Sequence, residues 1–437
     1  MNNKNQNLPP GWVWVQLGEV CHIYDNLRKP INSEERLKRI SGKQQNELFP
    51  YYGATGLVGY IDDYLIDGEY VLLGEDGAPF LDKTKNVAYI IKGKAWVNNH
   101  AHILSSYFDN HYLLHYLNHF EYKDFVSGTT RLKLTQASMK MIPIYLPPLS
   151  EQHRIVAKIE ELFSSLDKAV ERLKATREQL KIYRQAVLKW AFEGRFTHKD
   201  IKQGELPEGW VWKKLGEVCE VRNGYAFKSS DYLKQGENGI PVIRISDIEN
   251  GEVDLSNCVK IEEKTEYDYF IVSKDDILMA MSGATTGKFG IYKSDKKAYQ
   301  NQRVGKFDIF AKEVLYHSFL FYLLYSLKDK ILNNAYGGAQ PNISSAKIEG
   351  LSIPLPPLSE QQQIVSEIEK RLSVAEKVEE SIRVALEKAE RLRQSILKKA
   401  FEGKLVPQDP NDEPASVLLE RIKAERKTPR QEVDKKK

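Results

Sequence analysis

The sequence predicts an α+β fold in which two mixed α/β domains are separated by two long helices that pair as an antiparallel coiled coil. Residues 146–195 and 355–404 align without a gap at an offset of 209, and 23 of the 50 positions are identical. Residues 8–21 and 206–219 match at an offset of 198. Long duplicated blocks usually mark a duplicated structural unit, so we expect a pseudo-twofold internal repeat.

The composition is that of a globular protein with room for several domains. The 437 residues are 41% hydrophobic and 28% charged, and no apolar run approaches the ~20 residues that a membrane span requires. The first residues lack the apolar core of a signal peptide. We therefore expect a cytoplasmic protein that makes no membrane contact.

Residues 1–145 are expected to form the first mixed domain. Short β-rich runs such as 70–73 and 87–91 are separated by glycine and aspartate, and residues 110–119 have a helical pattern. Runs of this length bounded by turn residues are typical of strands in a mixed sheet.

Three histidines, His111, His115 and His119, recur every four residues on the helix expected at 110–119. This spacing can place ligands for a metal on one helix face. Their aromatic neighbours favour an ordinary packed face instead, and we expect no metal.

The segments 146–203, a helix with its linker, and 355–404 each predict one long helix. Apolar residues alternate in steps of four and three over about five heptads, the pattern of a left-handed coiled coil. Pseudo-twofold symmetry would make the two helices antiparallel, and the alternative that each helix packs on its own domain stays open. The expected seam and partner-binding residues are Ile155, Ile159, Leu166, Leu173, Leu180, Ile364, Ile368, Ile382, Leu392 and Ile396.

Residues 204–354 are expected to form the second mixed domain. It has β-rich runs at 241–245 and 276–281 and a helix near 314–327. The tail, residues 405–437, is polar, with a short amphipathic helix expected over 414–426.

The charge balance does not indicate nucleic acid. The net charge is only +4, residues 8–145 carry 14 Lys+Arg against 15 Asp+Glu, and residues 204–354 carry 19 against 21. Any DNA contact must therefore come from local clusters.

Loops rich in small, amide and cationic residues stand at matching places in both domains. Arginine can fork onto guanine, asparagine and glutamine can pair with adenine, and lysine and threonine can hold phosphates. Such loops are often only loops, so the candidates rest on residue type and position. The candidate DNA contacts are Asn98, Asn99, His100, Thr129, Thr130, Arg131, Lys133, Ser282, Thr285, Thr286, Lys288, Asn301, Gln302, Arg303, Gln340 and Asn342.

Enzyme motifs fail one by one. A phosphate loop needs four residues between its glycines, but only three separate Gly283 from Gly287, and Phe289 stands where a magnesium-binding hydroxyl should follow lysine. The sequence has no methyltransferase tetrapeptide, nucleophile elbow or zinc-protease motif. We expect no catalytic residue and no cofactor on this chain.

The duplicated blocks resemble the specificity subunit of type I restriction–modification systems. The sequence Leu-Pro-Pro-Leu-Ser-Glu-Gln precedes a long helix ending Ala-Phe-Glu-Gly, at 146–194 and again at 355–403. The Leu-Pro-x-Gly-Trp-x-Trp openings at 8–14 and 206–212 resemble the starts of that family's two target recognition domains. Residues 403–410 resemble its C-terminal signature, so the resemblance covers nearly the whole chain.

This resemblance implies that each domain reads one half of a bipartite double-stranded DNA target. The helices would set the gap between the halves and recruit two methyltransferase subunits, which bring S-adenosylmethionine. Restriction subunits that use ATP and Mg²⁺ would then join, and this chain would have no catalytic role.

Two alternatives remain, a fused restriction–methylation enzyme and a coiled-coil scaffold with two heads that do not bind DNA. The missing cofactor motifs weigh against the enzyme. Salt-sensitive, sequence-selective DNA binding would exclude the scaffold.

Overall fold

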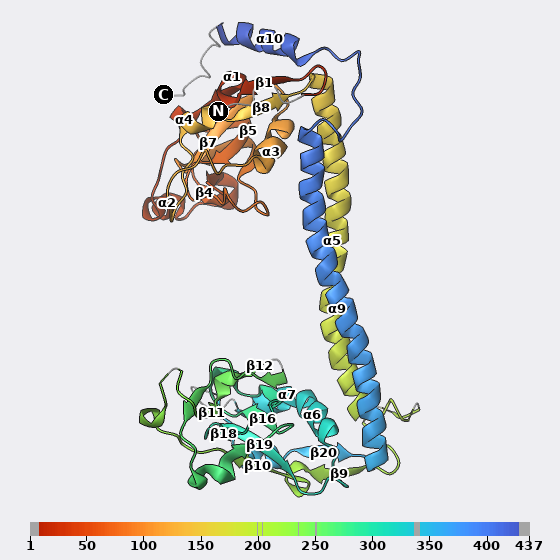
Figure 1. Ribbon diagram of the computed structural model, residues 1–437. Coiled ribbons are helices and arrows are strands. Elements are labelled where there is room, and N and C mark those ends of the chain that lie inside the picture. The colour runs from red at the N-terminus through yellow and green to blue at the C-terminus, as the bar shows by residue number, and fades with distance from the viewer. Residues whose placement is uncertain are drawn as a thin grey trace. The chain divides into compact units, whose positions relative to one another are not determined.

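The computed structural model describes residues 8–198, 200–202, 204–234, 236–249, 251–335 and 341–427. The chain divides into two compact units (Figure 1), one of residues 1–174 and 383–437 and the other of residues 175–382. Each unit contains one mixed α/β domain and part of both long helices, which confirms the predicted fold class. No helix in the described ranges is both long and apolar enough to cross a membrane.

The first domain is built on a six-stranded sheet in the order β2-β7-β5-β6-β3-β4. Only the β3–β6 pair is parallel, and a separate antiparallel pair, β1–β8, precedes the first long helix. The strands are β1 (Val13–Gln16), β2 (Cys21–Ile23), β3 (Phe49–Gly53), β4 (Gly56–Ile61), β5 (Ile66–Gly74), β6 (Ala88–Val97), β7 (Ala101–Ser106) and β8 (Pro143–Leu146). The helices are α1 (Leu17–Val20), α2 (Ser33–Ile40), α3 (Asn110–His119) and α4 (Gln136–Lys140), with 3-10 turns η1 (Asp25–Leu27) and η2 (Gln45–Glu47). The expected strands and the helix at 110–119 are confirmed.

The tail helix α10 (Ala415–Lys427) packs on the first domain. Leu418 and Ile422 are buried in that domain's core, and the amide of Ala415 donates to the carbonyl of Gly11 at 2.9 Å. The helix expected at 414–426 is thus confirmed. Its share in the first domain's core was not visible in the sequence, because its partners lie near the other end of the chain.

The histidines of α3 pack the first domain against the long helices. His115 meets the ring of Phe163 edge-on at 5.8 Å, and His119 stacks on Phe401 at 5.4 Å. Burial lowers the pKa of His115 to about 4. These rings contact different neighbours, which agrees with the interpretation of this helix face as a packed surface.

The second domain contains a six-stranded sheet, β10-β19-β16-β17-β13-β12, and a four-stranded sheet, β14-β11-β18-β15, with an antiparallel pair β9–β20. The strands are β9 (Val211–Lys214), β10 (Cys219–Asn223), β11 (Ile240–Ile243), β12 (Ile248–Glu249), β13 (Gly251–Val253), β14 (Val259–Ile261), β15 (Ile271–Val272), β16 (Ile277–Ala280), β17 (Phe289–Ile291), β18 (Ala298–Gln300), β19 (Val304–Ile309) and β20 (Ser352–Leu355). The helices are α6 (His317–Ser326), α7 (Lys328–Ala335) and α8 (Ser345–Glu349), with 3-10 turns η3 (Leu215–Glu217), η4 (Ser229–Asp231), η5 (Ile245–Asp247), η6 (Thr265–Phe270) and η7 (Gly283–Thr285). The helix expected near 314–327 is confirmed as α6, and a second helix, α7, follows it directly.

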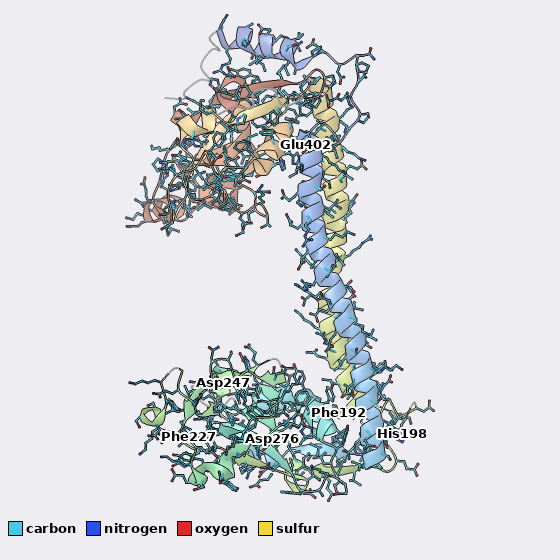
Figure 2. All side chains as sticks on the ribbon, viewed as in Figure 1. Phe192, His198, Phe227, Asp247, Asp276 and Glu402 are labelled. Carbon is cyan, nitrogen blue, oxygen red and sulfur yellow. The ribbon has the colours of Figure 1, made fainter. Side chains whose placement is uncertain are left out.

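Three apolar clusters hold the second domain, one of them around Leu278 and Tyr292. Phe192, at the end of a long helix, packs on Phe319 of α6 with ring centroids 5.3 Å apart. Phe227, Tyr267 and Tyr299 form a second cluster around the four-stranded sheet. Figure 2 labels Phe192 and Phe227.

The long helices α5 (Leu149–Phe192) and α9 (Leu358–Phe401) pair antiparallel within each unit. In the first unit, Asp167 of α5 pairs with Arg393 of α9. In the second unit, Arg184 pairs with Glu379 at 2.6 Å. The early part of α5 therefore meets the late part of α9, and the late part of α5 meets the early part of α9, as predicted.

Most of the expected seam residues are buried, but Leu392 is not. Ile155, Ile159, Ile364, Ile368, Ile382 and Ile396 are buried, and Leu166, Leu173 and Leu180 are half-buried. Leu392 is 49% exposed, because Arg393 takes the inward position, with its guanidinium 4.3 Å from the Phe163 ring centroid. The prediction of Leu392 in the seam was wrong.

Candidate nucleic-acid interface

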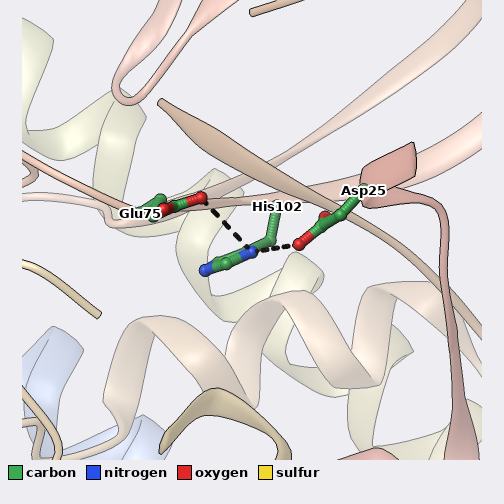
Figure 3. A group of neighbouring side chains, drawn as sticks. All are labelled: Asp25, Glu75 and His102. Atoms are coloured by element: carbon green, nitrogen blue, oxygen red, sulfur yellow. Dashed lines mark hydrogen bonds and ion pairs between the residues drawn. The ribbon is translucent and has the colours of Figure 1, made fainter. Parts of the chain in front are cut away.

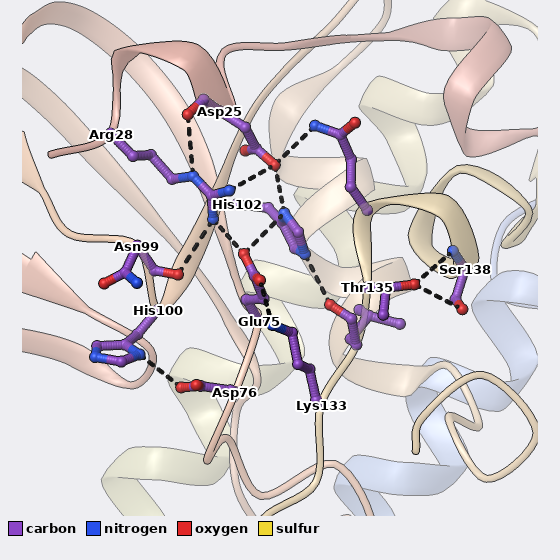
Figure 4. Close-up of polar contacts among 12 residues, drawn as sticks. Asp25, Arg28, Glu75, Asp76, Asn99, His100, His102, Lys133, Thr135 and Ser138 are labelled. Carbon is purple, nitrogen blue, oxygen red and sulfur yellow. Dashed lines mark hydrogen bonds and ion pairs between the residues drawn. The ribbon is translucent and has the colours of Figure 1, made fainter. Parts of the chain in front are cut away.

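Three candidate residues of the first domain, Asn99, His100 and Lys133, lie near the end of β5 (Figure 4). The turn 98–100 joins β6 to β7, and the segment 127–134 approaches from the other side. The amide of Glu75 donates to the carbonyl of His100 at 2.7 Å, and the amide of Leu134 donates to the carbonyl of Glu75 at 2.7 Å. Two loops that are distant in sequence are therefore fixed to one strand end.

An arginine and a histidine of these loops share one carboxylate oxygen. Oδ1 of Asp76 lies 2.7 Å from Nδ1 of His100 and accepts from the Arg131 guanidinium at 2.7 Å. Nearby, Nζ of Lys133 lies 3.2 Å from the Glu75 carboxylate. The Arg131 side chain is 62% exposed and that of Asp76 only 24%. The carboxylates of Asp76 and Glu75 thus hold the exposed side chains of Arg131 and Lys133.

Behind these loops lies a buried polar network centred on His102 (Figure 3). Its Nδ1 is 2.6 Å from Oδ2 of Asp25, and its Nε2 is 3.0 Å from the carbonyl of Leu134. The side-chain amide of Gln136 donates to the same Asp25 oxygen at 3.0 Å. Burial alone would raise the pKa of Asp25, but the hydrogen bonds from His102 and Gln136 outweigh burial and lower it.

Three residues of this network could be taken for a metal centre, but the contacts of Arg28 argue against that interpretation. Asp25, Glu75 and His102 offer ligand atoms within 4.8 Å of one another. The Arg28 guanidinium pairs with Asp25 at 3.2 Å and also with Glu75, and it donates to the carbonyl of Ala101 at 3.1 Å. The Arg28 guanidinium supplies the positive charge among these carboxylates, so the group forms an ion-pair network that ties the loop residues together.

The second domain repeats this backbone arrangement. The turn 301–303 joins β18 to β19, and the amide of Met281 donates to the carbonyl of Arg303 at 2.9 Å. The amide of Ile343 donates to the carbonyl of Met281 at 3.0 Å. Asp76 bridges to Lys133 in the first domain, and Ser282 bridges to Asn342 in the second.

These matching hydrogen bonds define equivalent residues with different side chains. His100 corresponds to Arg303, Asp76 to Ser282, and Lys133 to Asn342. The first interface is therefore a set of paired charges. In the second, Lys288 lies 3.5 Å from Glu249, while Arg303 is exposed and pairs with no carboxylate among the described residues.

Two predicted base-reading residues are instead buried structural groups. Asn98 is 7% exposed, and its Oδ1 accepts from the amide of His100 at 2.8 Å. Thr286 is 5% exposed, and its hydroxyl donates to the carbonyl of Gly283 at 2.7 Å. Each forms a bond that shapes its own loop, so the prediction that they contact bases was wrong.

The other candidates lie at or near the surface. Asn99, Thr129, Thr130, Arg131, Lys133, Gln302, Arg303 and Asn342 are exposed, and His100, Ser282, Thr285, Lys288 and Asn301 are partly exposed. Gln340 lies outside the described residues.

The carboxylates Asp76, Glu75 and Asp25 were not predicted from the sequence, because cations and amides are the residue types expected to contact DNA. The repeat itself carries the signal. Asp25 accepts from Gln136, and the residues at offsets of 198 and 209, Asn223 and Ser345, form the matching bond at 3.3 Å. Comparing polar residues across the two offsets pairs Asp25 with Asn223 and Gln136 with Ser345, but it does not pair Asp76 with Ser282, which lies 206 residues further on.

The family model for the type I restriction modification DNA specificity domain matches the chain twice, over residues 9–180 and 207–388. The chain is 29% identical over 381 residues to a putative type I restriction enzyme specificity subunit of Haemophilus influenzae, covering 86% of this chain and 92% of that protein. It is 31% identical over 323 residues to the EcoBI specificity subunit of Escherichia coli, covering 69% of this chain and 68% of that protein.

Solved structures share the fold. A chain from a structure concerned with complex assembly and conformational transition of the type I restriction–modification system superposes with a TM-score of 0.69 at 21% identity, covering 92% of this chain and all of that one. The HsdS subunit from Thermoanaerobacter tengcongensis gives a TM-score of 0.59 at 22% identity, covering 92% and 99%. The duplicated family match, the curated relatives and the fold agree, and the chain belongs to the type I restriction–modification DNA specificity family.

Proposed function

We propose that this chain reads a bipartite DNA sequence, with each mixed domain recognising one half. The observation that carries the proposal is the shared frame of the two interfaces. Equivalent hydrogen bonds, from Glu75 to His100 and from Met281 to Arg303, hold equivalent turns in the two domains. The two domains share a backbone arrangement but present different side chains from it. This is what two domains that recognise different half-sites require.

The exposed side chains have the chemistry for this task. Arg131 and Arg303 can each fork onto the O6 and N7 atoms of a guanine, while Asn99, Gln302 and Asn342 can pair with adenine. Thr129 and Thr130 can donate to phosphates and fix the register. Because neither domain is net basic, recognition rests on these local groups.

The paired helices are proposed to set the gap between the half-sites and to carry two methyltransferase subunits. Apolar side chains outside the seam support a partner role, since Ile182 is 66% exposed, Val374 56% and Leu392 49%. S-adenosylmethionine would be bound by those partners, and ATP and Mg²⁺ by restriction subunits that join them. This chain would contribute recognition and assembly without catalysis.

Mapping methylated adenines in cells that express this chain with its cognate modification subunit tests the proposal. We expect two short specified blocks around a fixed unspecified gap. Methyl transfer by the isolated chain would instead indicate a fused enzyme. A soluble complex that binds no DNA selectively would indicate a scaffold.

A further inference from the structure

The carboxylate of Asp76 stands in an unexpected place for a DNA-reading surface. It lies among the exposed residues of the first interface, where its negative charge opposes the approach of phosphates. The repulsion between this carboxylate and phosphates is partly offset, because its Oδ1 lies 2.7 Å from both the Arg131 guanidinium and the His100 ring. A residue that weakens general attraction to DNA but holds the Arg131 guanidinium and the His100 ring suits a role in orientation.

The backbone around Asp76 makes this orientation rigid. Asp76 forms a β-bridge with Lys133, and the amide of Gly77 donates to the carbonyl of Leu132 at 3.0 Å. The segment that carries Arg131 is thus bonded on its C-terminal side to the segment that follows β5 and carries Asp76. The backbone at Arg131 is therefore already fixed, and the hydrogen bond to Asp76 fixes its side chain.

The second domain has the equivalent backbone hydrogen bonds but no carboxylate at the position of Asp76. Ser282 occupies the place of Asp76 and Arg303 that of His100. The hydroxyl oxygen of Ser282 is buried without a hydrogen-bond partner among the described residues. The acidic anchor is therefore a property of the first interface and not a requirement of the frame.

We propose that Asp76 is a positioning residue that determines specificity in the half-site read by the first domain, which rests on the proposed function. It holds Arg131 so that the remaining N–H groups of the guanidinium meet a guanine edge in one geometry. A long arginine side chain loses rotamer freedom when it binds, and prior restraint by a carboxylate reduces that cost for the matched base only.

The test is Asp76→Asn in the complex with the modification subunits, with binding measured on duplexes that vary each base pair of the first half-site. We expect discrimination at one base pair to fall, by up to the roughly 5- to 150-fold that a good bidentate contact provides. Binding to unrelated DNA should strengthen and become more salt-dependent, because one negative charge is gone. A loop that is merely misfolded would weaken both kinds of binding.

Asp67→Asn is the matched control, since Asp67 is exposed near the other end of β5 and its loss removes the same charge. It should leave discrimination unchanged. In the double variant with Arg131→Ala, discrimination should be no worse than in Arg131→Ala alone, because Asp76 acts through Arg131. Additive losses would assign Asp76 a direct base contact and overturn the proposal, as would unchanged discrimination in Asp76→Asn. Failure of the wild-type complex to select any split site would instead refute the proposed function.

Discussion

Asp76 and Ser282 occupy equivalent places in the two domains, each forming an isolated β-bridge, with Lys133 in one case and Asn342 in the other. One is a carboxylate that bonds both the Arg131 guanidinium and the His100 ring, and the other is a small hydroxyl. The frame tolerates both because it is made from backbone hydrogen bonds. The side chains at these positions can therefore differ while the backbone frame stays the same.

Ser282→Asp should transfer the acidic anchor to the second domain. The new carboxylate would stand beside Arg303, as Asp76 stands beside His100, and should pair with the guanidinium. We expect changed base preference at one position of the second half-site and an unchanged first half-site. Methylation mapping of the variant measures both, with Ser282→Asn as the uncharged control. A preference that moves equally in both variants would show that shape and not charge is responsible.

Arg303→Ala should relax one base position in the half-site read by the second domain. Because Arg303 is exposed and pairs with no described carboxylate, it is free to fork onto guanine, and we expect a loss of about 1–3 kcal/mol against that base. Competition binding with single-base variants measures it. Equal weakening on every sequence would make Arg303 a phosphate contact, and Lys288→Ala provides the comparison for such a contact.

Periodicity and repetition predicted the fold well. The helix at 110–119, the antiparallel helices and the tail helix were all found from apolar spacing. Leu392 was misplaced because a heptad pattern counts apolar residues, whereas Arg393 can turn inward when a ring such as Phe163 receives its guanidinium. The four-stranded sheet of the second domain has strands of two to four residues, too short to show an alternation.

The sequence predicted where the loops of the candidate interface lie better than it predicted which of their side chains are exposed. The loops at 98–100, 129–133 and 301–303 do lie at matching strand ends. Asn98 and Thr286 were misjudged because residue type cannot tell whether a polar side chain bonds its own loop or faces solvent. The carboxylates of Glu75 and Asp76 were missed because an anion is unexpected near DNA until its cationic partners are seen.

Glu151→Gln should stabilise the first unit at neutral pH. Burial raises the pKa of Glu151, although Trp12 donates to it at 3.0 Å. A raised carboxyl pKa means that the folded state holds its proton more tightly, so stability is lost as pH rises through that pKa. The neutral amide avoids this loss and should raise the unfolding midpoint by about 2–4 °C, the effect of ~1 kcal/mol in a domain of this size.

The gain from Glu151→Gln should fade as pH falls toward 4, where both states carry the protonated acid. Glu360→Gln is the matched control, because Glu360 accepts from Trp210 at 2.9 Å and also from the hydroxyl of Thr197. It should give no gain at either pH. Thermal unfolding at pH 7 and at about pH 3.5, below the ordinary glutamate pKa, tests the pair, and a pH-independent gain for Glu151→Gln would contradict the assignment of its cause.

Insertion of one helical turn in both long helices tests whether they set the gap. Four residues added after Lys174 in α5 and four after Ile382 in α9 lengthen each helix by ~6 Å and nearly preserve the apolar seam. Because a base-pair step is about 3.4 Å, the unspecified gap should grow by about two base pairs while both half-sites stay unchanged. Insertion in α5 alone should instead misalign the pairing and lower the unfolding midpoint. If methylation mapping of the double insertion shows altered half-sites with the original gap, spacing is fixed by the domains, and the helices serve only to hold partners.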